Sequence, residues 1–543
     1  MLRPRTAAVA SLLLIPMVAG GFFLHQAPPP ATPRLFDQVL ALVASRYVDS
    51  LQGADVYEKA ATGLVRELND PYSELLAPRQ SEEFNRSTGG RYGGVGMLLE
   101  EQMSGRTTSI VVSRIFPHTP AEDGGVHEGD RIVRVDSLST ADAKIDKVSD
   151  ALRGVAGSRV QVTFQRPGVT EPVRLSFRRA IIHVPAVPYA TMVGDRIGYI
   201  PLQTFNENTA DEVGTAAARL VREGARGLVL DLRDNGGGIV EQALAVSSLF
   251  LRSGQAIVNV RSRNAPDEIA RASADQLSWQ PPLVILTDGG TASASEIVAG
   301  ALQDHDRALV LGTTSYGKGL VQSLFPLDGG YALKITTGKW YTPSGRSIHR
   351  ERTMRADGRT LEARPDSLET ESQRKARPTF SSDGGRTVYG GGGITPDVIV
   401  ADDTLLATEQ EFLRSLGPRA QSFVTVMNQY ALELKAVATR DFSIAPAWRT
   451  ELRRRLGAAG IAIDARHEPT ATLVLDRELD RRVSRLVLGD AGARQRSAAD
   501  DIQLARAVAL LAGARTQEAL FAAGRAAAGS ATSIEAAAKP DRN

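Results

Sequence analysis

Apolar residues follow three different spacings along the 543-residue chain, and each spacing predicts a different kind of domain. Residues 34–86 carry apolar positions at helical intervals and predict a small helical domain. Residues 89–182 hold short β-like runs separated by turn residues, with one helix-like segment, and predict a domain rich in strands. Residues 195–400 alternate strand-like and helix-like segments, which is the pattern of a layered α/β domain.

The remaining segments predict a loop and a helical tail. Residues 350–392 are polar, rich in arginine and glycine, and predict a long loop that leads into one last strand. From residue 404 the chain is rich in Ala, Leu and Arg at helical spacing, and we expect disorder after Gly529. We divide the chain into a signal peptide or membrane anchor (1–31), an N-terminal helical domain (32–88), a strand-rich domain (89–182), an α/β core (183–403) and a C-terminal helical region (404–543).

The N-terminus and the composition predict a protein exported from a bacterial cytoplasm. A basic start precedes an apolar run from Ala7 to Leu24, which fits a secretory signal peptide or an uncleaved membrane anchor. The chain has no cysteine, which excludes thiol nucleophiles, cysteine-ligated zinc and disulfide bonds. With 64 basic and 62 acidic residues, the chain lacks the charge excess that attracts nucleic acid.

The segment "GTTSYGKGLVQ", residues 312–322, raises the question of whether Lys318 binds a nucleotide. A phosphate-binding P-loop needs Ser or Thr after the lysine and a helix directly afterwards. Here Gly319 follows the lysine, and the next residues are β-like with a proline and a Gly-Gly turn. The sequence therefore argues against a nucleotide site and leaves Lys318 for another task.

Two strand-to-helix turns carry residues suited to acyl transfer. In "TDGGTASASEIVAGALQDH" the serines stand at the start of an amphipathic helix, whose free N–H groups can stabilise an oxyanion. The alternative is a capping box, in which Ser293 and Glu296 only satisfy backbone donors. In "LVLDLRDNGGGIVEQA", residues 236–238 can bring bare N–H groups close to a ligand, or they form a tight connection and nothing more.

A serine nucleophile needs a base, and histidine does not supply one in a recognisable pattern. The seven histidines include none in a motif that pairs a base with a nucleophile, and no Gly-x-Ser-x-Gly elbow occurs. A lysine desolvated in an apolar pocket can act as the base instead. Lys318, flanked by glycines and followed by "LVQSLF", has a sequence setting that suits this role.

These residues together resemble the carboxyl-terminal processing proteases, also called tail-specific proteases. The resemblance rests on "TASASEIVAGALQDHDRALVLGTTSYGKGLVQ", "GYIPLQTF", "LVLDLRDNGGG", "YTPSGRSI" and "GGGGITPD", and covers about residues 34–400. It implies a multidomain α/β fold with a crotonase/ClpP-like protease core, an inserted PDZ domain, and N- and C-terminal helical regions. Two departures, Thr291 for the usual serine and "NGGG" for "NPGG", touch no side chain with an implied chemical role.

The resemblance assigns roles in the core by position. It places the nucleophile at Ser293, the general base at Lys318, and at Gln322 a glutamine that orients the lysine. The oxyanion donors are then the backbone N–H groups of Ala294 and of a glycine in the "NGGG" turn, for which we choose Gly238. No metal or other cofactor is expected.

Residues 89–182 resemble a PDZ domain through "TPAEDGGVHEGDRIVRVDSLS". Such a domain binds a free C-terminus as an added strand and holds its carboxylate with successive backbone amides. The candidate carboxylate loop comprises Gly94, Val95, Gly96 and Met97. The candidate apolar pocket for the last side chain comprises Met97, Leu99, Val148 and Leu152, some of which can be plain core residues, and Arg153 is a candidate peptide sensor or an ordinary exposed arginine.

We therefore expect a serine endopeptidase of the bacterial cell envelope that acts on the periplasmic side, either anchored in the inner membrane or secreted. Its expected partners are unfolded or loosely folded protein C-termini, with a homodimer or adaptor contact through the helical ends and membrane contact only through the N-terminal segment. The alternative is a catalytically silent PDZ scaffold that only gathers unfolded tails. An intact Ser, Lys and Gln set argues against the scaffold.

Overall fold

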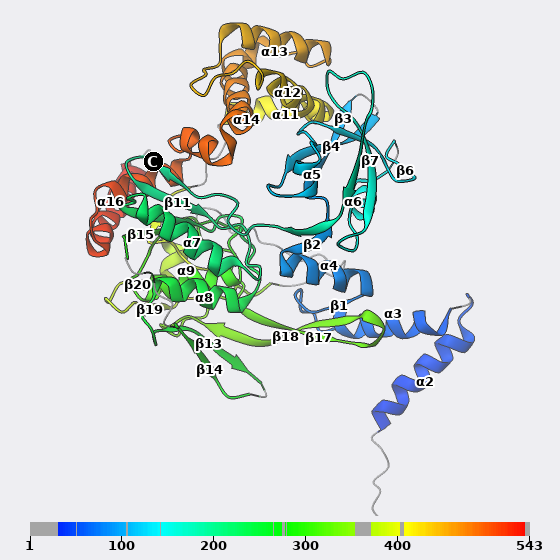
Figure 1. The fold of residues 1–543 in the computed structure, drawn as a ribbon. Helices are drawn as coiled ribbons and strands as arrows, with labels where there is room; N and C mark the ends of the chain where they lie inside the picture. The colour runs from blue at the N-terminus through cyan, green and yellow to red at the C-terminus, as the bar shows by residue number, and fades with distance from the viewer. Residues whose placement is uncertain are drawn as a thin grey trace, which may run out of the picture.

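A computed structural model of the chain describes most of residues 31–537 (Figure 1). The gaps are residues 50, 105–106, 142, 264, 274–276, 278–279, 353–370 and 402–406. The expected signal peptide or anchor at 1–31 lies outside the described residues except for its last position, and so does much of the expected loop at 350–392. Among the described residues, no helix combines the length and apolarity needed to cross a bilayer.

The core contains a six-stranded sheet in the order β10-β11-β12-β15-β16-β21. Its strands are β10 (Thr191–Val193), β11 (Ile197–Pro201), β12 (Gly227–Asp231), β15 (Leu283–Thr287), β16 (Leu309–Gly312) and β21 (Val398–Ile399). All neighbours from β11 to β21 are parallel, and only β10 is antiparallel. Every residue of β12, β15 and β16 is buried, as expected for a parallel sheet with both faces covered.

Helices cover both faces of this sheet. Alternate residues of β12 point to opposite sides: Leu228 and Leu230 pack with one set of helices and Val229 with the other. The first set is α7 (Thr209–Arg222), α8 (Val240–Phe250) and α9 (Ala294–Asp304), and the second is α15 (Ile502–Ala512) and α16 (Gln517–Ala537). The last two helices, which we assigned to a separate C-terminal region, therefore complete the core (Figure 1).

A second sheet joins the N-terminal region to the core. It has the order β1-β18-β13-β14, with β17 also paired to β18. Its strands are β1 (Glu74–Leu76), β13 (Ala256–Ser262), β14 (Glu268–Arg271), β17 (Leu320–Pro326) and β18 (Ala332–Tyr341), with a 3-10 turn η1 (Asp328–Gly330) between the last two. Because β1 pairs with β18, the N-terminal chain lies directly beside the strand hairpin that follows Lys318.

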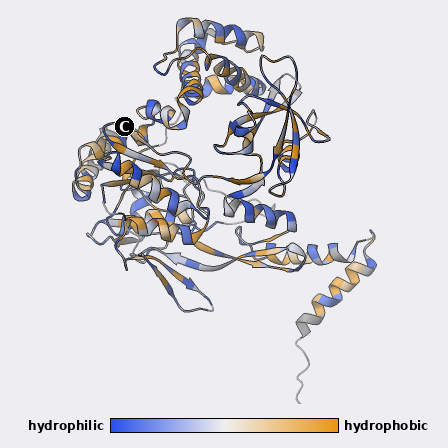
Figure 2. Ribbon diagram, in the orientation of Figure 1, coloured by the Kyte–Doolittle hydropathy of each residue, from blue (hydrophilic) through white to orange (hydrophobic). Residues whose placement is uncertain are grey.

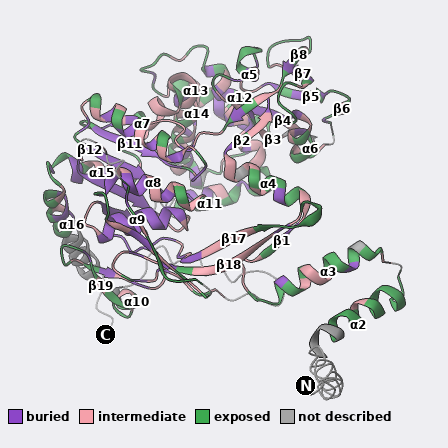
Figure 3. Ribbon diagram, turned by 60° about the horizontal axis from the view of Figure 1, so that its bottom comes forward, coloured by how far each residue is buried: buried purple, intermediate pink, exposed green. Residues whose placement is uncertain are grey.

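The N-terminal region is helical as predicted, but not all of it is packed. Its helices are α2 (Ala31–Arg46), α3 (Gly53–Arg66) and α4 (Pro78–Gly89). Helix α2 extends away from the body of the molecule and is coloured mainly as exposed, although its ribbon carries apolar stretches (Figures 2 and 3). Leu35 and Leu42, whose spacing predicted the helix, are 61% and 60% exposed. The apolar periodicity predicted helix α2 correctly, but its apolar residues stay exposed and do not pack on a core.

The strand-rich domain forms one antiparallel sheet with two short helices. The sheet has the order β3-β4-β5-β7-β8, with β6 paired to β5. Its elements are β3 (Met97–Ser104), β4 (Thr107–Ile115), α5 (Pro120–Asp123), β5 (Arg131–Val135), β6 (Leu138–Ser139), α6 (Ile145–Leu152), β7 (Arg159–Gln165) and β8 (Val173–Arg178). The two connections to the core, β2 (Arg91–Gly94) and β9 (Ala180–His183), pair with each other and close the domain.

The C-terminal region contains a separate helical subdomain. Its helices α11 (Ala407–Ser415), α12 (Ala420–Leu434), α13 (Pro446–Ala458) and α14 (Glu468–Ser497), with the 3-10 turns η2 (Gly417–Arg419) and η3 (Ala465–His467), share one apolar cluster. It contacts the strand-rich domain through α12 on β3 and through an Arg114–Asp490 ion pair at 3.0 Å. Helix α14 breaks at Gly489, which has a φ of 72°.

Two expectations about irregular segments need correction. Where a single long loop was expected at 350–392, the described part contains helix α10 (Glu371–Lys375) and the hairpin of β19 (Thr379–Ser381) and β20 (Thr387–Tyr389). The last strand expected after this segment is present as β21. Helix α16 also continues to Ala537, past the Gly529 after which we expected disorder, while residues 538–543 lie outside the described residues.

Candidate active site

The turn between β15 and α9 places Ser293 at the start of a buried helix. Asp288 fixes this turn, because its Oδ1 accepts hydrogen bonds from the amides of Gly290 and Thr291, each at 3.0 Å. Ser293 itself has a φ of 56°, an uncommon conformation for a residue other than glycine. Its hydroxyl makes no capping hydrogen bond to the helix. The backbone thus holds a strained serine whose hydroxyl is not used for structure.

Lys318 lies in the segment between β16 and β17. The residues after it form a strand, not a helix, which agrees with the rejection of a P-loop. The amide N–H of Lys318 donates to Glu296 Oε2 at 2.8 Å, and the amide N–H of Ser293 donates to the same oxygen at 2.8 Å. One carboxylate oxygen of α9 therefore holds the backbones of Ser293 and Lys318 against each other.

Glu296 is completely buried and accepts four hydrogen bonds. Besides the two amides at Oε2, its Oε1 accepts from the Ser315 hydroxyl at 2.5 Å and from the Gly317 amide at 2.6 Å. Burial raises the pKa of the Glu296 carboxyl, and the four donors oppose that shift by stabilising the ionised form. The alternative of a capping box holds only in part, because the Glu296 amide donates to the Ser293 carbonyl and not to its hydroxyl.

The Lys318 side chain is partly buried beside an aromatic ring. Its Nζ lies 5.0 Å from the centre of the Tyr72 ring, which comes from the N-terminal region. Burial lowers the pKa of the Lys318 amine, Lys334 lowers it further, and Glu296 and Asp70 oppose the shift. Within the described residues, no hydrogen bond joins Lys318 Nζ to Ser293 Oγ. Burial thus shifts the Lys318 pKa in the direction of the neutral amine, which is the form that can accept a proton.

In the structure, the Gln322 side chain is hydrogen-bonded to a threonine on the neighbouring strand. It stands on β17 directly across from Thr336 of β18, and its Nε2 donates to Thr336 Oγ1 at 3.4 Å. A register shift between Val321 and Gln322 interrupts the pairing of the two strands at this point. Within the described residues no hydrogen bond links Gln322 to Lys318, so the orienting role of Gln322 stays a prediction.

The "NGGG" turn lies against the serine turn. A Cβ added at Gly237 would fall 2.9 Å from the Ala294 nitrogen and 2.9 Å from Ser293 Cβ, so only glycine fits there. The Gly237 amide is already bound to Asn235 Oδ1 at 2.9 Å. In contrast, the amides of Gly238 and Ala294 have no acceptor among the described residues. These are the two N–H groups chosen as oxyanion donors, and the contact through Gly237 places their turns together.

A partly buried charge network joins residues just before the "NGGG" turn to helix α15, and sequence reasoning missed it. Arg233 pairs with Asp231 at 2.6 Å and with Asp501 at 2.8 Å, while the Tyr199 hydroxyl donates to Asp231 at 2.8 Å. Asp501 also caps α15 through the Leu504 amide. The available signal was the three charges in "LVLDLRDN", at the end of a buried strand.

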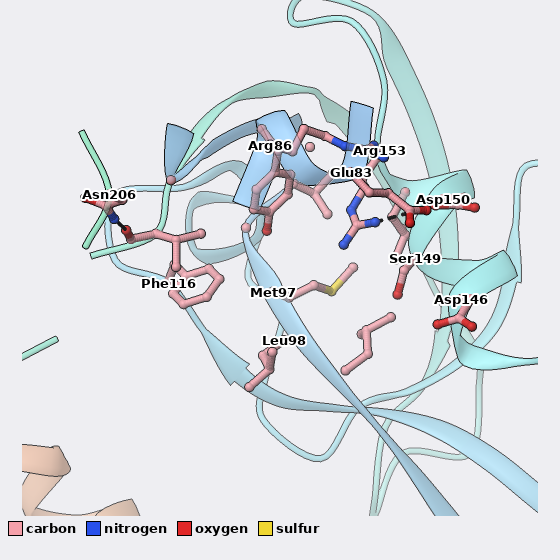
Figure 4. Close-up of a pocket in the computed structure, with 18 of the residues that line it drawn as sticks. Glu83, Arg86, Met97, Leu98, Phe116, Asp146, Ser149, Asp150, Arg153 and Asn206 are labelled. Atoms are coloured by element: carbon pink, nitrogen blue, oxygen red, sulfur yellow. Dashed lines mark hydrogen bonds and ion pairs between the residues drawn. The ribbon is translucent and has the colours of Figure 1, made fainter. Parts of the chain in front are cut away.

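The strand-rich domain carries a cavity of about 910 Å³ along β3 and α6 (Figure 4). The expected carboxylate loop, Gly94 to Met97, lines it, and the amides of Val95 and Gly96 have no acceptor among the described residues. Gly96 has a φ of 88°, and an added Cβ would lie 2.3 Å from Thr119 Cβ, so this position requires glycine. The loop thus offers free N–H groups to an anionic chain end.

Three of the four residues predicted to form the apolar pocket line the cavity. Met97, Leu99 and Leu152 line the cavity, but Val148 is completely buried in the domain core and does not. Val148 lies on the apolar face of α6, which packs against the domain core. Arg153 lines the cavity, with its guanidinium 5.6 Å from the centre of the Tyr92 ring.

Helix α4 of the N-terminal region forms a further wall that the sequence did not predict. Arg79, Gln80, Glu83 and Arg86 of this helix line the cavity. Arg79 forms an ion pair with Asp150 of α6 at 2.7 Å. The N-terminal region therefore contacts both the Lys318 side chain and the cavity of the strand-rich domain.

The fold defines this protein as an α/β peptidase core with an inserted PDZ domain. Residues 196–356 match the model of peptidase family S41, and residues 111–166 match that of a PDZ domain. The carboxy-terminal-processing protease of Bartonella bacilliformis is 37% identical over 58% of this chain and 71% of its own length. The chain belongs to the carboxy-terminal processing protease family and is a serine peptidase.

Two further proteins are similar to this chain in sequence. The carboxy-terminal processing protease CtpA of Bacillus subtilis is 32% identical over 64% of this chain and 73% of its own length. A solved photosystem II D1 C-terminal processing protease is 30% identical, covers 59% of this chain and 85% of its own, and superposes with a TM-score of 0.35.

Proposed function

We propose that this protein is an endopeptidase that binds the C-terminal ends of exported proteins in its PDZ domain and cleaves them with a Ser293–Lys318 dyad. The observation that carries the proposal is the shared hydrogen bonding of both backbones to one Glu296 oxygen. This contact holds the backbones of two distant segments together. It supports a reaction between the Ser293 hydroxyl and the Lys318 amine, whose pKa is lowered by burial.

The reaction follows from these groups. Ser293 Oγ attacks the scissile carbonyl carbon while neutral Lys318 Nζ takes the hydroxyl proton, and the amides of Gly238 and Ala294 stabilise the resulting oxyanion. The C–N bond then breaks, and the Lys318 ammonium returns the proton to the leaving amine. Water then attacks the acyl carbon while Lys318 Nζ takes a proton from it. The C–Oγ bond breaks, and the Lys318 ammonium gives its proton to Ser293 Oγ, which regenerates the serine hydroxyl. Gln322 is available to orient the lysine if the substrate draws the amine toward β17.

The PDZ cavity supports the proposed substrate class. An extended C-terminus that adds to β3 places its carboxylate at the free amides of Val95 and Gly96 and its last side chain near Met97. Only loosely folded chains can offer such an end and still reach the serine. We place the enzyme on the periplasmic side of the bacterial envelope, anchored or secreted, on the basis of the apolar run at residues 7–24.

The test uses the full chain and an unfolded protein substrate followed by mass spectrometry. We expect time-dependent cleavage near the substrate C-terminus, abolished in Ser293→Ala and in Lys318→Ala, while both variants still bind the substrate tail. A fluorophosphonate probe should label Ser293 in the wild type and not in Ser293→Ala. Cleavage that survives either substitution contradicts the dyad. Tail binding without any cleavage by the wild type would instead favour the PDZ scaffold.

A further inference from the structure

The segment between α3 and α4 reaches from the N-terminal region to the Lys318 side chain. Its position is fixed by strand pairing, because Glu74 of β1 lies across from Lys334 of β18 and the two side chains form an ion pair. The Ser73 hydroxyl accepts a hydrogen bond from the Thr336 amide at 3.0 Å. The segment is therefore attached to the same hairpin that begins two residues after Lys318.

Tyr72 is the residue of this segment that meets Lys318. Its ring centre lies 5.0 Å from Lys318 Nζ, inside the usual range for contact between an amine and an aromatic face. The Tyr72 hydroxyl accepts a hydrogen bond from Arg352 Nη1 at 2.9 Å. Arg352 in turn stacks on the Tyr316 ring at 3.6 Å and donates to the Tyr316 carbonyl at 2.6 Å. The ring is thus fixed at its hydroxyl end and covers the amine with its face.

An aromatic ring over an amine has two opposing effects. Its face attracts an ammonium, typically by ~0.5–2 kcal/mol, which favours the charged form. Its bulk excludes water, which favours the neutral form. Burial is the largest influence on the Lys318 pKa and lowers it, so exclusion of water outweighs the attraction here. Within the described residues no carboxylate forms an ion pair with the Lys318 amine, which leaves solvent exclusion as the main control.

We propose that Tyr72 is a positioning residue for the general base, whose ring shields the Lys318 amine from water and fixes its place beside the nucleophile turn. This inference rests on the proposed function, because it needs Lys318 to act as the base. It adds that the base pocket is completed by a residue outside the α/β core, from the segment that directly precedes α4 of the PDZ cavity wall. Without Tyr72 the amine would face solvent on that side.

The other charged and titratable groups around Lys318 come from several elements. They are Asp70 beside Tyr72, Glu296 of α9, Lys334 of β18, and His349 and Arg352 of the segment after β18. Burial raises the pKa of the Tyr72 hydroxyl, so it stays neutral over the working range and adds no charge. A change at Tyr72 that keeps the ring therefore leaves the charges around the amine unaltered.

The experiment compares the pH dependence of kcat/KM in Tyr72→Ala and Tyr72→Phe, using the full chain and a peptide substrate. In Tyr72→Ala water reaches the amine, and we expect the acidic limb of the profile to move to higher pH by about one unit. Activity at pH 7 should then fall about tenfold and recover at alkaline pH. Tyr72→Phe keeps the ring and loses the Arg352 bond, so its acidic limb should stay at the wild-type pH.

The recovery at alkaline pH separates this role from a structural one. Three outcomes would overturn the inference. They are a uniform loss of activity at every pH in Tyr72→Ala, an acidic limb of its pH profile that does not move, and an equal shift of that limb in Tyr72→Phe. If Tyr72→Ala does not fold by its melting curve, Tyr72→Leu takes its place with a smaller shift expected in the same direction. Lys318→Ala is measured alongside. If this variant still cleaves the peptide, the proposed function fails. If it is inactive and the acidic limb of the Tyr72→Ala profile has not moved, only the role of Tyr72 is refuted.

Discussion

The candidate active site and the PDZ cavity each present two backbone amides that have no acceptor in the described part of the chain, yet their surroundings differ. The amides of Gly238 and Ala294 stand beside a helix whose buried Glu296 takes four hydrogen bonds. The amides of Val95 and Gly96 stand in a cavity walled by separate elements and closed partly by exposed side chains. The first arrangement is held by internal hydrogen bonds and suits the proposed reaction, whereas the second borders an open cavity and suits the proposed binding of chain ends.

The largest effect is expected from Glu296→Gln. The substituted amide group cannot accept hydrogen bonds at its nitrogen, so buried donors among the Ser293, Gly317 and Lys318 amides lose their partner. Each unsatisfied buried donor costs about 1–3 kcal/mol of stability. Misplacement of the dyad should reduce kcat by about a hundredfold. Thermal unfolding and steady-state kinetics measure the two losses.

The control for this change is Glu241→Gln, which makes the same chemical substitution in the first turn of α8, where the side chain is exposed. We expect its stability to stay within about 0.5 kcal/mol of the wild type and its kcat to be unchanged. If Glu296→Gln behaves like this control, the buried carboxylate does not organise the site, and the contrast with the PDZ cavity disappears.

The next effect is expected from Gly237→Ala. The new Cβ would lie 2.8 Å from the Ala292 carbonyl and 2.9 Å from the Ala294 nitrogen, at a φ of 95° that side chains rarely adopt. The two turns must separate, and kcat should fall about tenfold or more with a smaller change in KM. Gly236→Ala is the matched control, because nothing lies within 4 Å of its added Cβ. Equal kinetics for the two variants would contradict close contact of the turns.

In the PDZ domain, Gly96→Ala should change binding more than chemistry. Its Cβ would meet Thr119, so the loop that carries the free amides must move. We expect KM for a peptide with a free C-terminus to rise about tenfold while kcat stays within about twofold. The same peptide with an amidated C-terminus serves as the control and should show no difference between wild type and variant. A fall in kcat alone would mean that this cavity is coupled to the reaction and does not act as a binding site.

The smallest effect is expected from Arg79→Ala, at the contact between α4 and the PDZ domain. The Arg79 and Asp150 side chains are 68% and 40% exposed, and ion pairs of this kind contribute at most about 1 kcal/mol. KM should rise less than about fivefold at low salt, and the difference should vanish at high salt. A double-mutant cycle with Asp150→Ala isolates the pair. A larger, salt-independent change would show that α4 controls access to the cavity by more than charge.

Local sequence patterns predicted the elements that depend on neighbours in the chain. The apolar runs of β12 and β15 predicted buried strands, and the glycines that follow them predicted sharp turns into helices. The rejection of a P-loop at Lys318 also needed only the next residues, which form β17. Recognition of the peptidase and PDZ motifs rested on the same short segments and is confirmed by the family matches.

The fold alone decided which distant groups meet. Glu296 looked like the end of a capping box, because its bonds to Ser315, Gly317 and Lys318 join segments that the sequence leaves apart. The contact of Tyr72 with Lys318 likewise depends on the pairing of β1 with β18.

The sequence by itself therefore determined the chemistry that is available in this protein: a serine, a lysine and glycine-rich turns at the ends of strands. Tertiary structure decided how α15 and α16 cover the core sheet, why Val148 is a core residue, and which side chains surround the amine. The physical reason is the distance along the chain over which each property acts. Helix and strand periodicity reports contacts within a few residues, whereas burial and pKa depend on everything that packs nearby in space.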